Sequence, residues 1–163
     1  MINGKKKPYA ILVFGAPMSG KTSFAEHFST SIEAPFINFD KLQHQFKLTR
    51  KATIEFIRIM ARGKQTIVIE GMGETENDRE EMRKLFIELG YRTALVWVQT
   101  DMNAIKQRML HRYKKLADAK AALSASYEHL EAPTEEEAPI VISGKHTPQT
   151  QNKNVLSRLA DIK

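Results

Sequence analysis

The sequence predicts an α/β fold built on a five-stranded, mostly parallel sheet. Five short apolar runs alternate with segments whose apolar residues recur at helical spacing. Two of these runs, residues 9–14 and 65–71, are nearly unbroken, as expected for strands that helices cover on both faces. Such alternation favours parallel strands joined by right-handed crossovers. A chain of 163 residues has the usual size of one domain, so we expect a single domain over residues 1–163.

The first half of the chain contains three of the predicted strands. We expect them at residues 9–14, 34–39 and 65–71. A helix is expected at residues 22–30, and two short helices are expected between about residues 41 and 62. Ligands of parallel α/β sheets bind beyond the carboxyl ends of the strands. The residues that follow each strand are therefore the first candidates for function.

Residues 75–90, which read TENDREEMRKLFIELG, carry clear signals for a helix. Thr75 and Asp78 form a capping box at its start, and Gly90 is expected to end it. The apolar side chains of this segment recur every three or four residues, which predicts a buried stripe. The stripe consists of Met82, Leu85, Phe86 and Leu89.

The rest of the chain supplies two more strands and two more helices. We expect strands at residues 91–98 and 138–144, and helices that begin near Asp101 and Pro148. Trp97 lies inside the fourth strand and is predicted to belong to the core. The last helix carries apolar residues at helical spacing, namely Val155, Leu156 and Leu159.

The composition excludes several classes of protein. The chain has no cysteine, so it has no disulfide framework and no cysteine nucleophile. No apolar run approaches the roughly 18 residues of a membrane-spanning helix. The run after Lys5–Lys7 is too short for a signal peptide and has no cleavage site. We therefore expect a cytoplasmic protein without a membrane partner, whose net charge of +6 favours anionic partners such as nucleotides.

Residues 15–22 contain the pattern G-x-x-x-x-G-K-[ST], formed by Gly15, Gly20, Lys21 and Thr22. The two glycines allow positive φ angles, so that successive N–H groups can converge on phosphate oxygens. Lys21 adds a mobile positive charge for the β- and γ-phosphates, and the Thr22 hydroxyl can hold Mg²⁺. The helix that follows directs its positive N-terminal end at the same anion. An apolar strand precedes the pattern and a helix follows it, which identifies a P-loop.

The predicted nucleotide-binding residues share this loop and the first helical turn. They are Gly15, Ala16, Pro17, Met18, Ser19, Gly20, Lys21, Thr22 and Ser23.

Two carboxylates follow neighbouring strands. Asp40 ends the run INFD, and Glu70 ends the run IVIE. A phosphotransferase needs one carboxylate to accept the proton of the acceptor hydroxyl, and often another to hold Mg²⁺ or its waters. We expect Glu70 to act on the metal together with Thr22. Three roles stay open for Asp40: catalytic base, metal ligand, or N-cap of a helix that begins at Lys41.

Arg108 and Arg112 lie one turn apart on a predicted helix, and neither has an acidic residue three or four positions away. Like charges at this spacing repel each other unless an anion lies between them. We expect both arginines at the transferring phosphate, where phosphoryl transfer requires positive charge. The alternative is a solvated basic face that pairs with glutamates at 135–137. The opposite, core-facing stripe is predicted to contain Met102, Ile105, Met109, Tyr113 and Leu116.

Residues 113–138 form a segment rich in alanine, serine and charged residues. It is compatible with helix but has few large apolar side chains. A movable lid over the nucleotide is one interpretation, since lids exclude water from such sites. A surface helical hairpin is the other. His111 and His129 are isolated, so no metal site is expected on protein side chains alone.

Several segments of the chain, taken in order, resemble one family. They are the P-loop, INFD, VIEG, ENDREEMRKLFIELGY, the arginine helix and YEHLEAPTEEEAPIVISG. Together they resemble the small P-loop kinases, which include polynucleotide 5′-kinase domains and zeta-toxin-like and gluconate kinases. The resemblance covers nearly the whole chain. It implies a nucleoside-kinase-like three-layer sandwich of the P-loop NTPase class, with a helical lid.

The resemblance also implies transfer of the γ-phosphoryl group of ATP, with Mg²⁺, to a hydroxyl group. It gives the base role to Asp40 and the lid-arginine role to Arg108 or Arg112. Two departures count against a polynucleotide acceptor. Gln43 stands where the polynucleotide kinases have an arginine, and Glu70 stands where they have an aspartate.

Three functions are compatible with these features of the sequence. The first is a kinase with ATP and a hydroxyl acceptor as partners, the acceptor being a small molecule or, less favoured, a nucleic-acid end. The second is a regulatory or accessory ATPase whose output is a conformational change. The third is a protein that binds nucleotide for stability only. A catalytic base at Asp40 separates the first from the others, because a switch needs no acceptor base.

Overall fold

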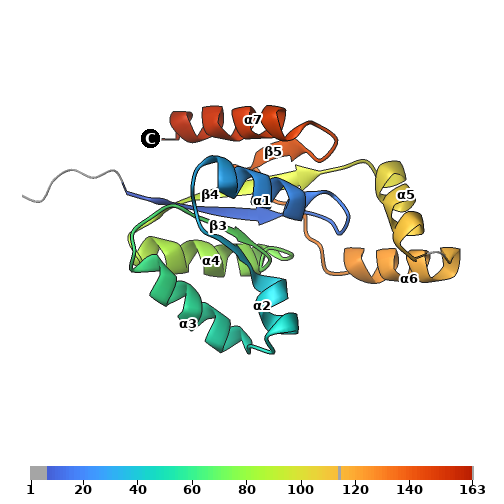
Figure 1. Ribbon diagram of the computed structural model, residues 1–163, viewed down its shortest axis with the longest axis horizontal. Coiled ribbons are helices and arrows are strands. Elements are labelled where there is room, and N and C mark those ends of the chain that lie inside the picture. Colours follow the sequence, from blue (N-terminus) through green and yellow to red (C-terminus); the bar gives the residue numbers. More distant parts are fainter. Residues whose placement is uncertain (1–6, 114, 163) are drawn as a thin grey trace, which may run out of the picture.

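Strands and helices alternate along the chain in the computed structural model, which describes residues 7–113 and 115–162 (Figure 1). The strands are β1 (Tyr9–Phe14), β2 (Phe36–Asn38), β3 (Ile67–Glu70), β4 (Arg92–Gln99) and β5 (Ile140–Ser143). The helices are α1 (Lys21–Ser31), α2 (Phe39–Gln45), α3 (Arg50–Ala61), α4 (Glu76–Glu88), α5 (Met102–Tyr113), α6 (Leu116–Tyr127) and α7 (Pro148–Asp161). Residues 1–6, 114 and 163 lie outside the described part of the predicted domain.

The described strands form one parallel sheet in the order β2-β3-β1-β4-β5. The chain leaves β1 toward β2 and β3 on one side and later crosses to β4 and β5 on the other. The carboxyl end of β1 is therefore a topological switch point, where the connections diverge and leave room for a ligand. Val13 stands opposite Glu70 in this sheet, and Phe14 stands opposite Trp97.

Helices cover both faces of the sheet, which gives three layers (Figure 1). On one face α1 and α7 contribute Phe24, Phe28 and Val155 to a core that includes alternate residues of β1 and β4. On the other face α2, α3 and α4 supply Phe39, Ile57 and Phe86, among others. Nearly continuous apolar strands are the ones that such two-sided cover requires. The predicted fold class is confirmed.

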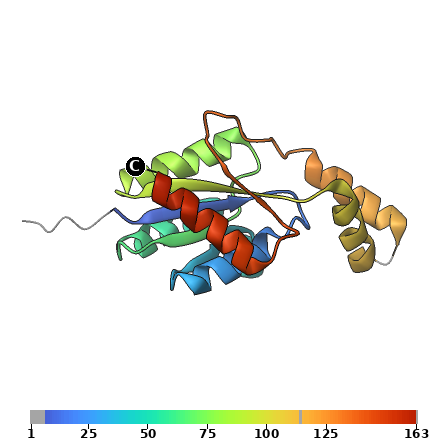
Figure 2. The ribbon, with the colours of Figure 1, turned by 90° about the horizontal axis from the view of Figure 1, so that it is seen from above.

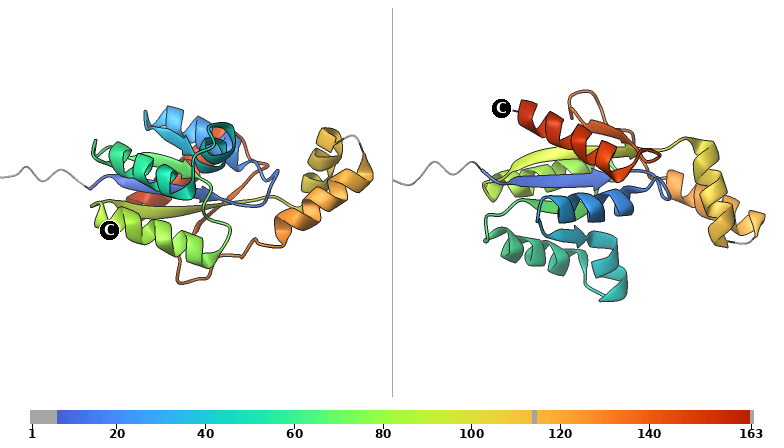
Figure 3. Two further views of the ribbon diagram at one scale, coloured as in Figure 1. Left: turned by 90° about the horizontal axis from the view of Figure 1, so that it is seen from below. Right: turned by 45° about the horizontal axis from the view of Figure 1, so that its top comes forward.

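The helices α5 and α6 lie beyond the carboxyl end of the sheet and project from the rest of the chain (Figures 2 and 3). They pack on each other through Ile105, Met109 and Ala119, and against Ala16 of the P-loop. Of this α5–α6 pair, α6 lies within the predicted lid range of residues 113–138, whereas α5 precedes the range except for Tyr113. No helix among the described residues is long and apolar enough to cross a membrane.

The helix predicted at residues 75–90 is present as α4. The Thr75 hydroxyl accepts a hydrogen bond from the Asp78 N–H and donates one to the Asp78 carboxylate. Gly90 follows the helix with a φ of +80°, a left-handed conformation that favours glycine. Met82, Leu85 and Phe86 are buried, and Leu89 packs partly buried against them.

The second strand and the helix after it differ from the prediction. β2 ends at Asn38, and α2 begins at Phe39 rather than at Lys41. The side chain of Asn38 accepts a hydrogen bond from the Lys41 N–H at 2.8 Å, so Asn38 is the N-cap. The interpretation of Asp40 as the cap is therefore wrong, because an asparagine two positions earlier caps equally well. Asp40 lies instead in the first turn of α2.

Some residues expected in the core are exposed. Leu156 is 47% exposed, because α7 turns Val155 toward the sheet and the next residue away from it. Met102 and Tyr113, at the two ends of α5, are 40% and 37% exposed, since this helix packs through its middle. The side chain of Leu116 lies outside the described residues.

Candidate functional site

The P-loop connects the end of β1 to the start of α1. Gly20 has a φ of +101°, and α1 begins at Lys21 without any side-chain cap. The backbone N–H groups of the first turn are thus left to a ligand, and an anion suits them. Inside the loop, Ser19 is fully buried, and its Oγ has no hydrogen-bond partner among the described residues. These features fit the loop to phosphate groups.

The ends of two strands hold the loop in place. The Thr100 hydroxyl, just after β4, donates a hydrogen bond of 2.7 Å to the Ser19 carbonyl. Gly144, just after β5, approaches the same carbonyl so closely that a Cβ on it would lie 1.8 Å from the oxygen. A larger residue at position 144 would therefore displace the P-loop. Both positions follow strands, as expected for residues that build the site.

Glu70 lies at the centre of the site, at the end of β3. It is only 2% exposed. The Thr22 hydroxyl donates a hydrogen bond of 2.6 Å to its Oε1, and the Asn38 amide donates one of 3.0 Å to its Oε2. The Nζ of Lys21 is 4.0 Å from Oε1. Three elements, β2, β3 and α1, therefore meet at one carboxylate.

Burial raises the pKa of Glu70 above its ordinary value of 4.5. The hydrogen bond from Thr22 and the charge of Lys21 act in the opposite direction, and the negative charge of Asp40 adds to the rise. The charged form is therefore only partly compensated by the protein itself. A cation near Oε1 would complete the compensation.

Asp40 is exposed and faces the loop that follows Glu70. A Cβ on Gly71 would lie 3.3 Å from Oδ1 of Asp40, so the carboxylate touches the backbone of this loop. Gly71 has a φ of +93° and cannot carry a larger residue without strain. Within the described residues, the Asp40 carboxylate has no hydrogen bond or ion pair. It is free to interact with a ligand.

The two arginines of α5 reach the P-loop from the other side. Arg108 donates hydrogen bonds to the carbonyl oxygens of Met18, at 2.8 Å, and Gly144, at 3.2 Å. Arg112 is exposed, with Nη1 3.8 Å from the sulfur of Met18. Neither arginine forms an ion pair within the part of the chain that the structure describes. The proposed pairing with glutamates at 135–137 is therefore not found.

The P-loop, the start of α1 and one side of α5 line a cavity of about 400 Å³. Its lining includes Lys21, Thr22 and Ser23 from α1 and Arg108 and Arg112 from α5. The structure thus brings both predicted arginines to the predicted phosphate site. Glu70 and Asp40 are not among the residues that line this cavity: Glu70 is joined to it through the hydrogen bond with Thr22, and Asp40 lies beside Gly71.

Magnesium fits this site only together with a nucleotide. Among the described residues, no three histidine, aspartate or glutamate side chains gather as a metal centre. A Mg²⁺ ion usually takes one or two protein oxygens and completes its shell with waters and phosphates. The Thr22 hydroxyl and the incompletely compensated Glu70 carboxylate, 2.6 Å apart, are suitable oxygens.

A family model described as an AAA domain matches residues 11–136, which is most of the chain. The chain belongs to this AAA-domain family. The match begins in β1 and includes the P-loop, Glu70 and both arginines of α5. A comparison with curated proteins finds no match.

Solved structures with the same fold include several kinases. A gluconokinase from Sinorhizobium meliloti 1021 is 20% identical, with a TM-score of 0.70 over 97% of this chain and 95% of that one. The APS kinase of Mycobacterium tuberculosis, in complex with AMPPNP and APS, is 16% identical, with a TM-score of 0.67 over 96% and 99%. The shikimate kinase of Aquifex aeolicus vf5 is 19% identical, with a TM-score of 0.52 over 94% and 96%. The fold is thus that of the small P-loop kinases, as the sequence predicted.

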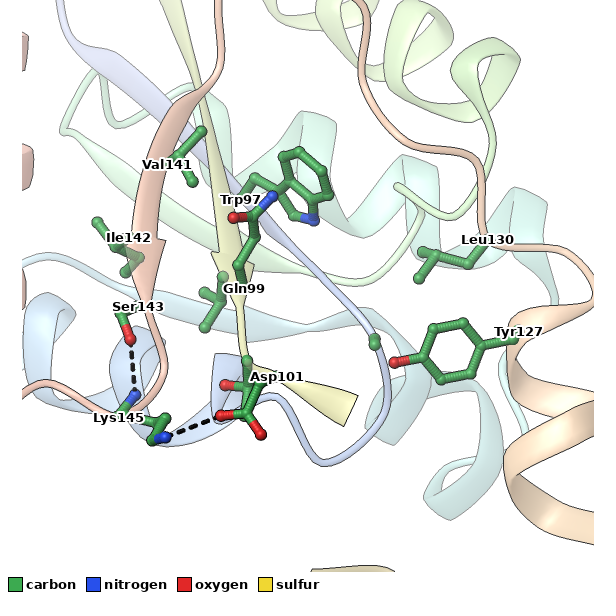
Figure 4. A pocket seen from close by; sticks show the side chains of 12 residues that line it. Trp97, Gln99, Asp101, Tyr127, Leu130, Val141, Ile142, Ser143 and Lys145 are labelled. Atoms are coloured by element: carbon green, nitrogen blue, oxygen red, sulfur yellow. Dashed lines mark hydrogen bonds and ion pairs between the residues drawn. The ribbon is translucent and has the colours of Figure 1, made fainter. Parts of the chain in front are cut away.

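In this AAA-domain protein, Trp97 is not a core residue. Its ring stacks on Phe14 but is only half-buried, and it lines a cavity of about 630 Å³ beside β4 and β5 (Figure 4). Tyr127 and Leu130, at the end of α6, face it across this cavity. Val141 of β5, opposite Trp97 in the sheet, lines the same cavity and is 49% exposed, so this part of the sheet is open on the side of Trp97.

Two residues of the site were not predicted. Asn38 binds Glu70 and caps α2; a capping residue three positions before the predicted helix start was an available signal. Arg79 is 2% exposed in α4 and donates hydrogen bonds to the carbonyl oxygens of Gly73 and Glu131. It stands three residues before Met82, on the same face of the helix. That spacing places it in the buried stripe despite its charge.

The raised pKa of Glu70 predicts a pH-dependent effect of Glu70→Gln on the nucleotide- and metal-free protein. Glutamine can accept the hydrogen bond of Asn38 and donate one to Thr22, so the substitution removes mainly the charge. A carboxyl group whose pKa is raised on folding stabilises the folded state while it is protonated, and this stability is lost as the pH rises through the raised pKa. The variant should therefore gain stability over the parent from about pH 4.5 upward and reach a plateau at higher pH. Urea unfolding at a series of pH values measures this gain; a variant that is less stable than the parent throughout would contradict it.

Proposed function

We propose that the protein is an ATP-dependent kinase that transfers the γ-phosphoryl group to a hydroxyl group of an acceptor. The observation that carries this proposal is the pair of carboxylates on either side of the 71–73 loop. Glu70 is buried against the P-loop threonine, whereas Asp40 is exposed and without a partner among the described residues. Metal binding and proton acceptance need these two different environments.

The donor side of the reaction uses the P-loop and α1. The free N–H groups at the start of α1 and the Lys21 ammonium would neutralise the phosphates of ATP. Thr22 and Glu70 would hold Mg²⁺, which would supply positive charge that stabilises the phosphates during transfer. The Thr22 hydroxyl donates its hydrogen bond to Glu70, so the lone pairs of this oxygen stay available to a metal ion.

The acceptor side uses Asp40. A hydroxyl group bound beside Gly71 would lie within reach of its carboxylate, which would take the hydroxyl proton as the new O–P bond forms. The bond between the γ-phosphorus and the bridging oxygen of ATP would break at the same time, and ADP would leave. Arg108 and Arg112 would bind the transferring phosphoryl group from the opposite side. In this state Arg108 exchanges the carbonyl oxygens of Met18 and Gly144 for phosphate oxygens, so the α5–α6 pair acts as a lid.

The acceptor class is a hydroxylated small molecule or the hydroxyl end of a nucleic acid. The gluconokinase, APS kinase and shikimate kinase that share the fold support a small molecule by analogy. We place the protein in the cytoplasm, because a chain without cysteine suits a reducing compartment. A regulatory ATPase remains the competing function, and it would need neither an acceptor nor Asp40.

The experiment that separates these functions measures ADP release with and without candidate acceptors. Sugars, sugar acids, nucleosides and oligonucleotides with a free 5′ hydroxyl make up the panel. A kinase releases ADP several-fold faster when its acceptor is present. Turnover that no acceptor changes would favour the regulatory ATPase.

Lys21→Ala is expected to abolish tight binding of ATP with Mg²⁺ while the fold stays intact. The side chain of Lys21 is directed into the phosphate cavity and belongs to no core cluster. Calorimetric titration measures the affinity, and Lys153→Ala, an exposed lysine of α7, is a control with the same change in charge. Equal ATP affinity in the Lys21 variant and the parent would contradict the assignment of Lys21 to phosphate binding.

Asp40→Asn is expected to lower acceptor-dependent turnover by about 10² to 10⁴, the usual effect of losing a general base. ATP affinity should change little, and stability should stay within roughly 0.5 kcal/mol because the side chain is exposed. Asp161→Asn, exposed at the end of α7, is the matched control. A parallel loss of ATP·Mg²⁺ affinity would instead make Asp40 a metal ligand, and unchanged turnover would exclude the base role.

A further inference from the structure

The chain returns from α6 to the sheet along the N-terminal end of α4. Figure 3 shows this return segment passing beside α4 before it enters β5. The α5–α6 pair is thus attached to the sheet through two chain segments, which we call its roots. The first root follows β4 directly, and the second consists of residues 131–137. The first root is held by an exposed ion pair, in which Lys145 and Asp101 lie 2.8 Å apart. The second is held by the buried side chain of Arg79.

Arg79 is the centre of the second root. Its Nε and Nη2 donate hydrogen bonds of 2.6 and 3.0 Å to the two carboxylate oxygens of Glu137. Its Nη1 donates to the carbonyl oxygens of Gly73 and Glu131, each at 3.0 Å. Its guanidinium also lies 4.9 Å from the ring centre of Phe14, the last residue of β1. One side chain therefore joins the P-loop strand, the loop after Glu70 and the return segment.

Glu131 and Glu137 are fixed by further contacts. The Glu131 N–H donates to the Glu74 carbonyl oxygen at 2.8 Å, and the Glu131 carboxylate accepts from the Glu76 N–H at 2.7 Å. Glu137 also accepts a hydrogen bond from the Thr134 N–H at 2.8 Å. The hydrogen bonds to Arg79 hold the pKa of Glu137 below its usual range, so this carboxylate stays charged at neutral pH.

The hydrogen bonds that hold the second root differ from those between the α5–α6 pair and the P-loop. The α5–α6 pair touches the P-loop through Ala16 and Met18 and through the hydrogen bonds of Arg108. A phosphate that binds Arg108 replaces some of these contacts, whereas it leaves those of Arg79 unchanged. Apolar side chains could fill a buried site of this kind at less cost in desolvation than an ion pair. The two-pronged contact between Arg79 and Glu137 instead fixes the orientation of the segment that it holds.

We propose that Arg79 is a positioning residue for phosphoryl transfer. It fixes the 131–137 root of the α5–α6 pair against the 71–73 loop, so that the pair closes with Arg108 and Arg112 at the phosphates. This inference rests on the proposed kinase function. Arg79 acts through Gly73, Glu131 and Glu137 and touches no substrate. Its loss should therefore uncouple closure of the α5–α6 pair from nucleotide binding without removing nucleotide binding itself.

The test measures hydrogen exchange of the full chain with and without Mg²⁺ and a non-hydrolysable ATP analogue. In the parent, the nucleotide should slow exchange in residues 15–31 and in residues 116–127. Arg79→Lys keeps the charge but loses the fork. It should retain the slowing at 15–31 and lose most of that at 116–127. In turnover assays its kcat should fall roughly 10- to 10²-fold while the KM for ATP changes little, as expected when catalytic groups are misplaced.

Arg83→Lys is the matched control. Arg83 lies one turn further along α4 and forms an equally forked pair with Glu80, but on the exposed face. It should behave like the parent in both assays. Glu137→Gln, which keeps the shape of the acceptor, provides a second variant if Arg79→Lys fails to fold, and should lose part of the slowing at 116–127.

The outcomes separate this proposal from the kinase assignment. Exchange needs neither an acceptor nor turnover, so loss of slowing in the Arg79 variant supports positioning even if no acceptor is ever found. Equal slowing and equal kcat in Arg79→Lys and Arg83→Lys would overturn the proposal. A parent whose residues 116–127 do not respond to nucleotide would overturn it as well.

Discussion

Burial of a single carboxylate at the end of β3 is the constraint on which the site depends. Glu70 is 2% exposed, and a buried charge costs free energy unless its surroundings compensate for it. Thr22, Asn38 and Lys21 compensate in part, yet the pKa stays raised. In the free protein, the negative charge of Glu70 is therefore not fully compensated, and a nearby cation would compensate it. If Mg²⁺ binds beside Glu70 as we propose, the unfavourable burial of this carboxylate in the free protein favours the state with nucleotide and metal bound.

The parts of the site differ in how firmly they are held. The P-loop rests on Thr100 and Gly144 at the ends of β4 and β5, and the return segment rests on Arg79. Arg108 instead donates its hydrogen bonds to neutral carbonyl oxygens. A phosphate could replace these acceptors, because hydrogen bonds between charged groups are stronger. We propose that the α5–α6 pair, rather than the P-loop, moves when nucleotide binds. Closure of the pair would then leave the contacts of the P-loop with Thr100 and Gly144 in place.

The sequence predicted what depends on local pattern. The P-loop, the strands and the α4 caps follow from residue types at fixed spacing, and the structure places both α5 arginines at the P-loop. The start of α2 was missed by two residues, because Asn38 and Asp40 are equally good capping residues. The contact between Arg79 and Glu137 joins residues 58 positions apart, and no local pattern carries such a pairing. Trp97 was misplaced because the strand pattern does not reveal that its face of β4 and β5 borders a cavity.

The most direct test of the role of Glu70 is the contribution of magnesium to ATP affinity. Calorimetry would titrate ATP into the parent, Glu70→Gln and, as control, the exposed Glu88→Gln, each with and without Mg²⁺. Losing a group that supports a metal typically lowers metal affinity by about 10- to 100-fold. The expected result is that Mg²⁺ strengthens ATP binding in the parent and the control, and that this gain shrinks by about that factor in Glu70→Gln. An equal gain in all three proteins would contradict a metal-binding role for the buried carboxylate.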